Sequence, residues 1–194
     1  MTQNKVKYRL KQLFHSYYWV LFLVLILDII SKALAHTLLT EQVVIIPNFF
    51  SFNLYYNTGA AWSFMSDQTV ILMLISLVAT GAFLFARIYY RNKIDIHYKI
   101  IAALVIAGTA GNLIDRTLTV AGVLDGVIDF IRFDFGNYTF PIFNIADASL
   151  VIGAIYLFII LLFTPDKKKE EHEENESNNG EEVNPPLEEK EQEK

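Results

Sequence analysis

The sequence contains no cysteine among its 194 residues. This absence excludes disulfides, thiolate metal sites and a cysteine nucleophile, and it leaves the redox compartment undetermined. The four histidines lie outside the interiors of the long apolar runs, and no His-Glu-x-x-His motif occurs. A zinc site of that kind is therefore not indicated. We expect neither a metal nor another cofactor.

Charged residues are scarce over four long stretches of the chain. Hydrophobic residues make up 53% of the sequence, which is high for a soluble domain. The apolar runs cover residues 17–35, 69–86, 98–114 and 145–163. Each is close to the roughly 17–25 residues that a helix needs to cross a bilayer. The pattern predicts an all-α membrane protein with four transmembrane helices, in a membrane domain of residues 1–165.

Lysine and arginine are missing from residues 36–68, and residues 115–144 contain only Arg116 and Arg132. Basic residues instead gather before the first run, between the second and third, and after the fourth. Membrane proteins retain such basic segments on the cytoplasmic side. We therefore expect both termini in the cytoplasm and the other two loops outside.

The C-terminal segment has a different composition. Residues 166–194 carry 12 acidic and 5 basic side chains, a net charge of −7 against −5 for the whole chain, which leaves +2 for residues 1–165. So few apolar residues cannot offset the entropy of ordering, and we expect a disordered acidic cytoplasmic tail. The bases of residues 1–165 lie mostly at span ends, so the charge does not indicate a nucleic-acid partner.

The two loops predicted to lie outside contain β-type runs. Residues 43–46 and 49–56 are rich in β-branched and aromatic side chains, and residues 128–133 and 138–142 flank a turn at 134–137. We predict a small extracytoplasmic β-element. With the turn centred between Phe135 and Gly136, Asp129 is expected to face Ile142.

Three aspartates lie inside the apolar runs, at their ends or between them. Asp28 interrupts the first run, Asp129 lies between the third and fourth runs, and Asp147 lies at the start of the fourth. A charged residue in a bilayer costs roughly 2.5–3.5 kcal/mol on insertion scales, so such acids indicate function. Chain connectivity allows Asp129 to approach Asp147, where two carboxylates sharing one proton can activate water.

Other polar residues cluster near these acids along the chain. Asn144 precedes Asp147 by three residues, and Asn112, Asp115 and Arg116 share one face at the end of the third run. Asp115 and Arg116 either balance each other's charge at a helix end or contribute to the site, with Arg116 and Asn112 holding a substrate backbone.

Asp28 and Lys32 are four residues apart, so they can pair on one helix face or serve the site directly. Gly108 and Gly111 permit close approach of either another helix or a substrate. Lysines, an apolar run and Ala33-Leu-Ala35 also resemble a cleavable signal peptide. Asp28 and Lys32 interrupt that run, so we favour an uncleaved first helix.

Five motifs together resemble those of bacterial lipoprotein signal peptidase (signal peptidase II), in the same order, spacing and topology over residues 17–163. They are Asp28-Ile-Ile-Ser-Lys32, Asn57-Thr-Gly-Ala-Ala61, Gly111-Asn-Leu-Ile-Asp-Arg116, Val127-Ile-Asp-Phe130 and Phe143-Asn-Ile-Ala-Asp147. The approach to Asn112 reads Ala107-Gly-Thr-Ala-Gly111, where the family usually has Gly-Gly-Ala. Thr109 is still small, so helix packing should be preserved.

The resemblance implies an intramembrane aspartic endopeptidase, in which Asp129 and Asp147 form the catalytic pair. It further implies that Asn57, Gly108, Asn112, Arg116 and Asn144 line the substrate site, with Asp28, Lys32 and Asp115 in support. The expected substrates are lipidated prolipoproteins, cleaved before the diacylglyceryl-modified cysteine. We expect a monomer in the bacterial inner membrane, in contact with membrane lipids, with its active site on the extracytoplasmic side.

Two other functions fit buried acids. A proton-coupled transporter or channel predicts acids spread across the membrane depth, whereas Asp129 and Asp147 gather at one edge. A non-enzymatic assembly or sensor protein would pair its acids with a partner's bases. Asparagine substitutions at Asp129 and Asp147 distinguish these functions from hydrolysis.

Overall fold

The computed structural model describes residues 17–59 and 68–164. The chain divides into two compact units, residues 1–159 and 160–194, and only residues 160–164 of the second are described. The predicted acidic tail, residues 166–194, and the last two residues of the Asn57–Ala61 motif lie outside the described part.

Within the described residues, four helices are long and apolar enough to cross a membrane, as the sequence predicts. They are α2 (Tyr18–Leu38), α3 (Thr69–Tyr89), α4 (Ile96–Val120) and α5 (Ile145–Phe163). Most of their large apolar side chains are exposed; in α3, only Leu72 and Arg87 are buried. An apolar helix with so little buried surface requires lipid around it.

Helix α4 is longer than the predicted run, residues 98–114. It begins at Ile96, where the Asp95 side chain accepts a hydrogen bond from the His97 backbone N–H. It continues to Val120 because Asp115 is buried and ion-paired, and Thr117 and Thr119 bond to carbonyls of their own helix. Polar residues that looked like the end of a span are therefore accommodated inside the helix.

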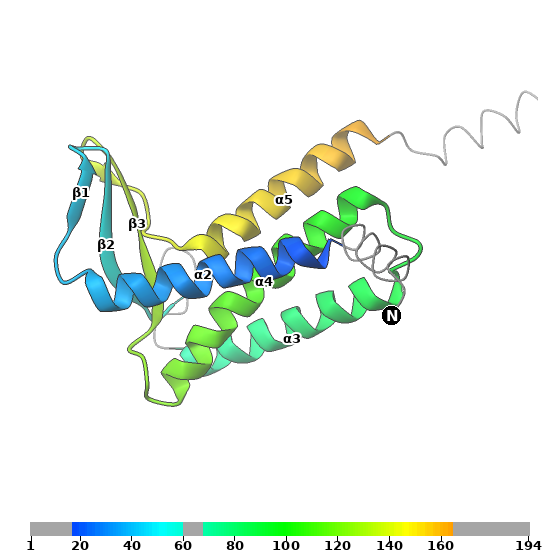
Figure 1. The fold of residues 1–194 in the computed structure, drawn as a ribbon, viewed down its shortest axis with the longest axis horizontal. Helices are drawn as coiled ribbons and strands as arrows, with labels where there is room; N and C mark the ends of the chain where they lie inside the picture. The colour runs from blue at the N-terminus through cyan, green and yellow to red at the C-terminus, as the bar shows by residue number, and fades with distance from the viewer. Residues whose placement is uncertain (1–16, 60–67, 165–194) are drawn as a thin grey trace, which may run out of the picture. The chain divides into compact units, whose positions relative to one another are not determined.

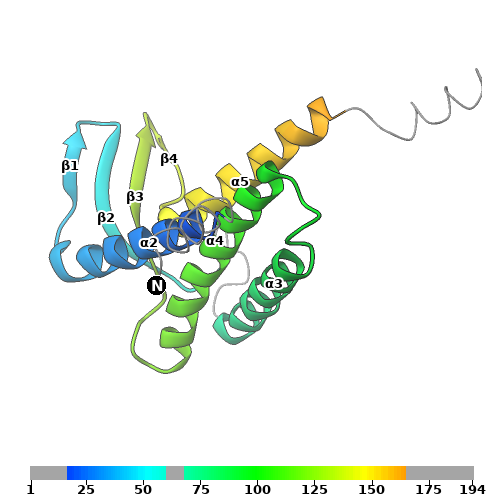
Figure 2. The same cartoon turned by 45° about the vertical axis from the view of Figure 1, so that its right-hand side comes forward.

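The loops between α2 and α3 and between α4 and α5 form one antiparallel sheet at one end of the helices (Figure 1). Its strands, in spatial order, are β1 (Val43–Ile46), β2 (Phe50–Asn57), β3 (Val127–Phe135) and β4 (Tyr138–Thr139). Figure 2 shows the same four strands side by side. The long β2–β3 pairing joins segments seventy or more residues apart and places Tyr55 opposite Asp129. The prediction of four helices with a small β-element is confirmed.

The β3–β4 hairpin differs from the predicted register. Asp134 pairs with Thr139 and Phe135 with Tyr138, so the turn centres between Gly136 and Asn137, one residue later than expected. Gly136 has φ +63°, a left-handed conformation that glycine adopts without strain. β4 ends before Pro141, which has no backbone N–H to donate. The sequence pattern predicts that Asp129 faces Ile142, and the later turn means that it does not.

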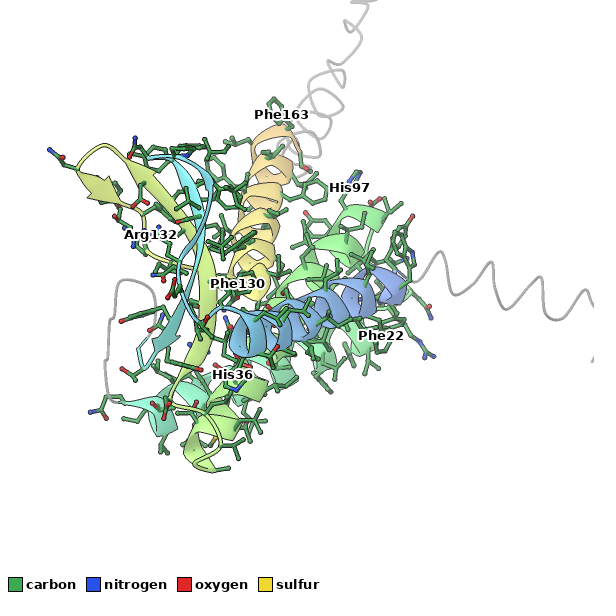
Figure 3. All side chains as sticks on the ribbon, turned by 60° about the vertical axis from the view of Figure 1, so that its left-hand side comes forward. Phe22, His36, His97, Phe130, Arg132 and Phe163 are labelled. Atoms are coloured by element: carbon green, nitrogen blue, oxygen red, sulfur yellow. The ribbon has the colours of Figure 1, made fainter. Side chains whose placement is uncertain are left out.

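An apolar cluster fastens the sheet to the helices. Ile128 and Phe130 of β3 are buried against Ala35 of α2, with Ile145 of α5 packed beside them. Figure 3 labels Phe130 on the strand next to the adjoining helices. This packing fixes the sheet near the C-terminal end of α2 and the N-terminal end of α5, where Asp147 lies.

Candidate active site

Buried polar side chains concentrate where α2, α4 and α5 meet β3. Asp28 and Asn144 have no exposed surface, and Asp129 is 1% exposed. Buried polar and charged groups are costly unless they are hydrogen-bonded or paired. These residues do bond to one another, and together they form a continuous network.

Asp129 lies on β3, and both of its carboxylate oxygens accept hydrogen bonds from amide side chains. Asn144 Nδ2 donates to Oδ1 at 2.7 Å, and Asn57 Nδ2 donates to Oδ2 at 2.9 Å. Asn57 ends β2, the neighbouring strand. The β2–β3 pairing therefore brings together the motifs that contain Asn57 and Asp129, which are far apart in the sequence.

Asp147 lies in the first turn of α5, three residues after Asn144, which caps the N-terminus of the helix. The Asn144 backbone N–H donates to Asp147 Oδ2 at 3.2 Å, and the Asp147 N–H donates to Asn144 Oδ1 at 2.9 Å. This reciprocal arrangement is a capping box. Asn112 Nδ2 of α4 donates to the other oxygen, Oδ1, at 2.7 Å. A helix N-terminus also favours a negative charge at this position.

Asp129 and Asp147 share one cavity and one bridging residue. Asn144 contacts Asp129 through its side chain and Asp147 through its backbone. Both aspartates line a cavity of about 580 Å³. Burial, followed by the negative charge of Asp147, raises the pKa of Asp129 to about 7. A pair of this kind can hold one proton at neutral pH.

A second cluster surrounds Lys32 of α2. Its ammonium lies 2.9 Å from Asp28 Oδ2, 3.0 Å from Asp115 Oδ2 and 3.1 Å from Asn112 Oδ1. The predicted Asp28–Lys32 pairing is thus confirmed. Asp28 Oδ1 also accepts the Ala146 N–H, and Asp115 Oδ2 accepts the Ile128 N–H. The cluster therefore joins α2 and α4 to α5 and β3.

Asp115 and Arg116 are not joined by an ion pair within the described part of the chain. Lys32 is the partner of Asp115, while Arg116 Nη1 donates to Ser76 Oγ of α3 at 3.1 Å and lines the cavity. Consecutive residues on a helix point about 100° apart, so Asp115 and Arg116 face different neighbours. Sequence reasoning missed Ser76, although it is a hydroxyl residue within an otherwise apolar span.

The two glycines of α4 serve helix packing. A Cβ at Gly108 would meet Ala146 O, Ser149 Oγ and Leu150 Cγ of α5, each at 2.6 Å. A Cβ at Gly111 would overlap the Asp28 carboxylate. Of the two meanings of these glycines, close approach of another helix is the one that the structure shows. Gly108 lies behind the cavity wall and not in it.

The predicted site residues divide into two groups. Five line the cavity: Asn57, Asn112, Arg116, Asp129 and Asp147. The others, Asp28, Lys32, Gly108, Asp115 and Asn144, lie behind them and hold them through the contacts given above. The rest of the lining is largely apolar and includes Val127, Phe140 to Phe143 and, on α5, Leu150 to Ile152.

Among the described residues, no three histidine, aspartate or glutamate side chains are grouped so that they could hold a metal ion. Asp28 and Asp115 approach each other, but the Lys32 ammonium occupies the position between them. The groups available for chemistry in the cavity are two carboxylates, two amides, one guanidinium and the hydroxyls of Ser76 and Thr109.

Comparisons with known proteins identify the family. The family described as "Signal peptidase (SPase) II" matches residues 20–163. A lipoprotein signal peptidase of Pseudomonas paraeruginosa is 40% identical over 146 residues, covering 72% of this chain and 83% of that protein. One of Bacillus pumilus is 36% identical over 148 residues, covering 74% and 90%. One of Neisseria gonorrhoeae is 40% identical over 144 residues, covering 71% and 84%.

Two solved structures share the fold. Both are described as bacterial membrane enzymes determined by the in meso method. The structure at 2.3 Å resolution has a TM-score of 0.64 and 29% identity, covering 87% of this chain and 93% of its own. The structure at 1.9 Å has a TM-score of 0.63 and 32% identity, covering 76% and 92%. With the family match spanning all four helices and the sheet, this chain belongs to the signal peptidase II family.

Proposed function

We propose that this protein is an aspartic endopeptidase of the bacterial cytoplasmic membrane. It removes signal peptides from lipidated prolipoproteins and cuts before the diacylglyceryl-modified cysteine. The observation that carries this proposal is the placement of Asp129 and Asp147 in one cavity, bridged by Asn144. The family membership supports the substrate class, because the curated relatives are lipoprotein signal peptidases.

The two carboxylates divide the chemistry. Asp147, at the N-terminus of α5, takes a proton from water, and the water oxygen attacks the scissile carbonyl carbon. Asp129 gives its proton to the carbonyl oxygen, forming a neutral tetrahedral diol. The proton on Asp147 then passes to the leaving nitrogen while a diol proton returns to Asp129. The C–N bond breaks, and no atom beyond those of water and the peptide is consumed.

The other lining residues orient the substrate. Arg116, whose guanidinium bonds to Ser76, and Asn112 present N–H donors that can bind backbone carbonyls of the signal peptide. The apolar stretch Leu150–Ile152 of α5 continues the cavity along a membrane-spanning helix. This supports lateral entry of the signal helix between spans, while the lipid of the substrate stays in the bilayer.

The distribution of basic residues supports one orientation in the membrane. Both termini, including the acidic tail at 166–194, are placed in the cytoplasm, and the sheet and the cavity on the opposite side. We propose that the protein acts as a monomer in contact with membrane lipids.

The test is cleavage by the purified full-length protein in detergent, with a diacylglyceryl-modified precursor as substrate. We expect cleavage before the modified cysteine, and the same rate with or without a chelator, because the catalytic groups are carboxylates. The unlipidated precursor serves as the matched control and should be cleaved slowly. Loss of activity on chelation, or equal cleavage of both precursors, would contradict the proposal.

The pH dependence follows from the proton on Asp129. The raised pKa, about 7, means that Asp129 is protonated below that pH and loses its proton above it. Since the protonated form is the acid, we expect the cleavage rate to fall above pH ~7, by about tenfold per pH unit at the limit. Single-turnover rates measured together with the thermal midpoint separate this fall from unfolding. A rate that stays constant well above neutral pH would contradict the assignment.

A further inference from the structure

Three asparagine side chains point their NH₂ groups at the two carboxylates. Asn57 and Asn144 donate to Asp129, and Asn112 donates to Asp147. An amide turned by half a rotation would present its oxygen instead, and two acceptors would then face each other. The orientation of each amide therefore decides whether the site favours or opposes a negative charge.

In each of the three residues, the amide oxygen is itself held by a donor. Asn57 Oδ1 accepts the Gly59 backbone N–H at 3.0 Å, and Asn144 Oδ1 accepts the Asp147 N–H at 2.9 Å. Asn112 differs: its Oδ1 accepts the Lys32 ammonium at 3.1 Å and a weaker contact from Asn144 Nδ2 at 3.2 Å. Of the three orientations, only this one depends on a charged side chain.

We propose that Lys32 is a positioning residue for cleavage, acting through Asn112 on Asp147. Its ammonium holds the Asn112 oxygen, so that the NH₂ group stays on Asp147 Oδ1, 2.7 Å away. A hydrogen-bond donor, and not the amide oxygen, therefore faces the carboxylate that takes the proton from water. The inference rests on the proposed function, because it assigns Asp147 the role of the base.

The Lys32 ammonium is held in place by burial and by two anchored carboxylates. Lys32 is 3% exposed, and the two carboxylates that flank it are anchored by the Ala146 and Ile128 backbone N–H groups. With one cation and two anions, the cluster has a net charge of −1. The ionisable groups around Asp147 are Asp28 and Lys32 of α2, Asp115 and Arg116 of α4, and Asp129 of β3.

Two variants separate positioning from simple charge balance. Asp115→Asn keeps Lys32 and its contact with Asn112. Lys32→Met combined with Asp115→Asn removes that contact and keeps the native net charge of −1 in the cluster. The double variant is compared with the native protein, which has the same net charge in the cluster, and Asp115→Asn alone controls for the loss of Asp115. In the double variant we expect the acidic limb of the kcat–pH profile, on which activity falls as the base takes up a proton, to move to higher pH by about one unit relative to the native protein, a tenfold loss of rate on that limb. KM should change little, and the rates should converge at higher pH.

A third variant covers the case in which the double variant does not fold. Asn112→Leu keeps Lys32 and both ion pairs but removes the amide. Asn112→Leu should move the acidic limb in the same direction as the double variant does. Combining Asn112→Leu with Lys32→Met and Asp115→Asn should move the limb no further, because both changes act through the same amide. A limb that stays at its native position in Asn112→Leu would overturn the proposal. So would an unmoved limb in a folded double variant, since Lys32 would then only hold the helices together.

The same assay distinguishes this inference from the proposed function. Cleavage retained in Asp147→Asn would refute the function itself, and Lys32 would have no base to position. An inactive Asp147→Asn protein together with an unmoved acidic limb would refute only the role of Lys32.

Discussion

Asparagine in place of Asp129 or Asp147 should reduce cleavage of the lipidated precursor by at least about a thousandfold. Each proton-transfer group contributes on the order of 10²–10⁴-fold, and here the two carboxylates share one proton, so neither can act alone. The measurement is single-turnover cleavage of the lipidated precursor by each variant. Asp125, which is exposed in the loop before β3, provides a matched control. Asp125→Asn makes the same chemical change outside the cavity, so this variant should cleave the precursor at the native rate.

Folding of the two variants has to be checked separately. In each variant, the NH₂ group of the new asparagine takes the place of one carboxylate oxygen and faces an N–H group that had donated to that oxygen. This unmade hydrogen bond lowers the free energy of unfolding by roughly 1–3 kcal/mol. Removal of a buried charge offsets part of that cost. Thermal midpoints in detergent should therefore stay close to that of the native protein. Cleavage above about a tenth of the native rate in either folded variant would refute the aspartic mechanism, whereas a gradual loss of binding would favour an assembly protein.

Alanine in place of Gly108 or Gly111 should strongly destabilise the protein and abolish cleavage. At Gly108 the added methyl group meets Ala146 O, a backbone atom that cannot rotate away. At Gly111 it meets the Asp28 carboxylate, which is already held by Lys32 and the Ala146 N–H. Overpacking of this kind costs typically 1–3 kcal/mol, occasionally more. It would also push α5 away from α4 and take Asp147 out of reach of Asn112.

Two other glycines in the spans provide a graded control. A Cβ at Gly81 of α3 would have nothing within 4 Å, so Gly81→Ala should leave stability and cleavage near native values. At Gly153 the nearest atom is Val105 Cγ2 at 3.2 Å, a side-chain atom that can shift, and an intermediate effect is expected. Thermal midpoints should fall in the order Gly81, Gly153, then Gly108 and Gly111. Equal midpoints for Gly81→Ala and Gly108→Ala would show that α4 and α5 are not closely packed.

Sequence reasoning determined the parts that depend on local pattern. Apolar runs of membrane-spanning length predicted the four helices, β-branched and aromatic runs predicted the strands, and five ordered motifs indicated the family. The Asp28–Lys32 pair also followed from their spacing, because residues four apart lie on one face of a helix. For the helices, the strands and this ion pair, the information lies within a short segment of the sequence, and for the family it lies in the order and spacing of the motifs.

Tertiary structure decided what depends on contacts between distant segments. The hairpin register differs by one residue from the predicted register because Gly136 occupies the left-handed position of the turn. Asp129 therefore contacts the Asn144 amide and not Ile142. The partner of Asp115 came from another helix, not from its neighbour Arg116. Ser76 contacts Arg116 only because α3 packs against α4. The orientation of Asn112 likewise depends on a lysine eighty residues away. Periodicity specifies which residues share a face, but only packing in three dimensions specifies what that face meets.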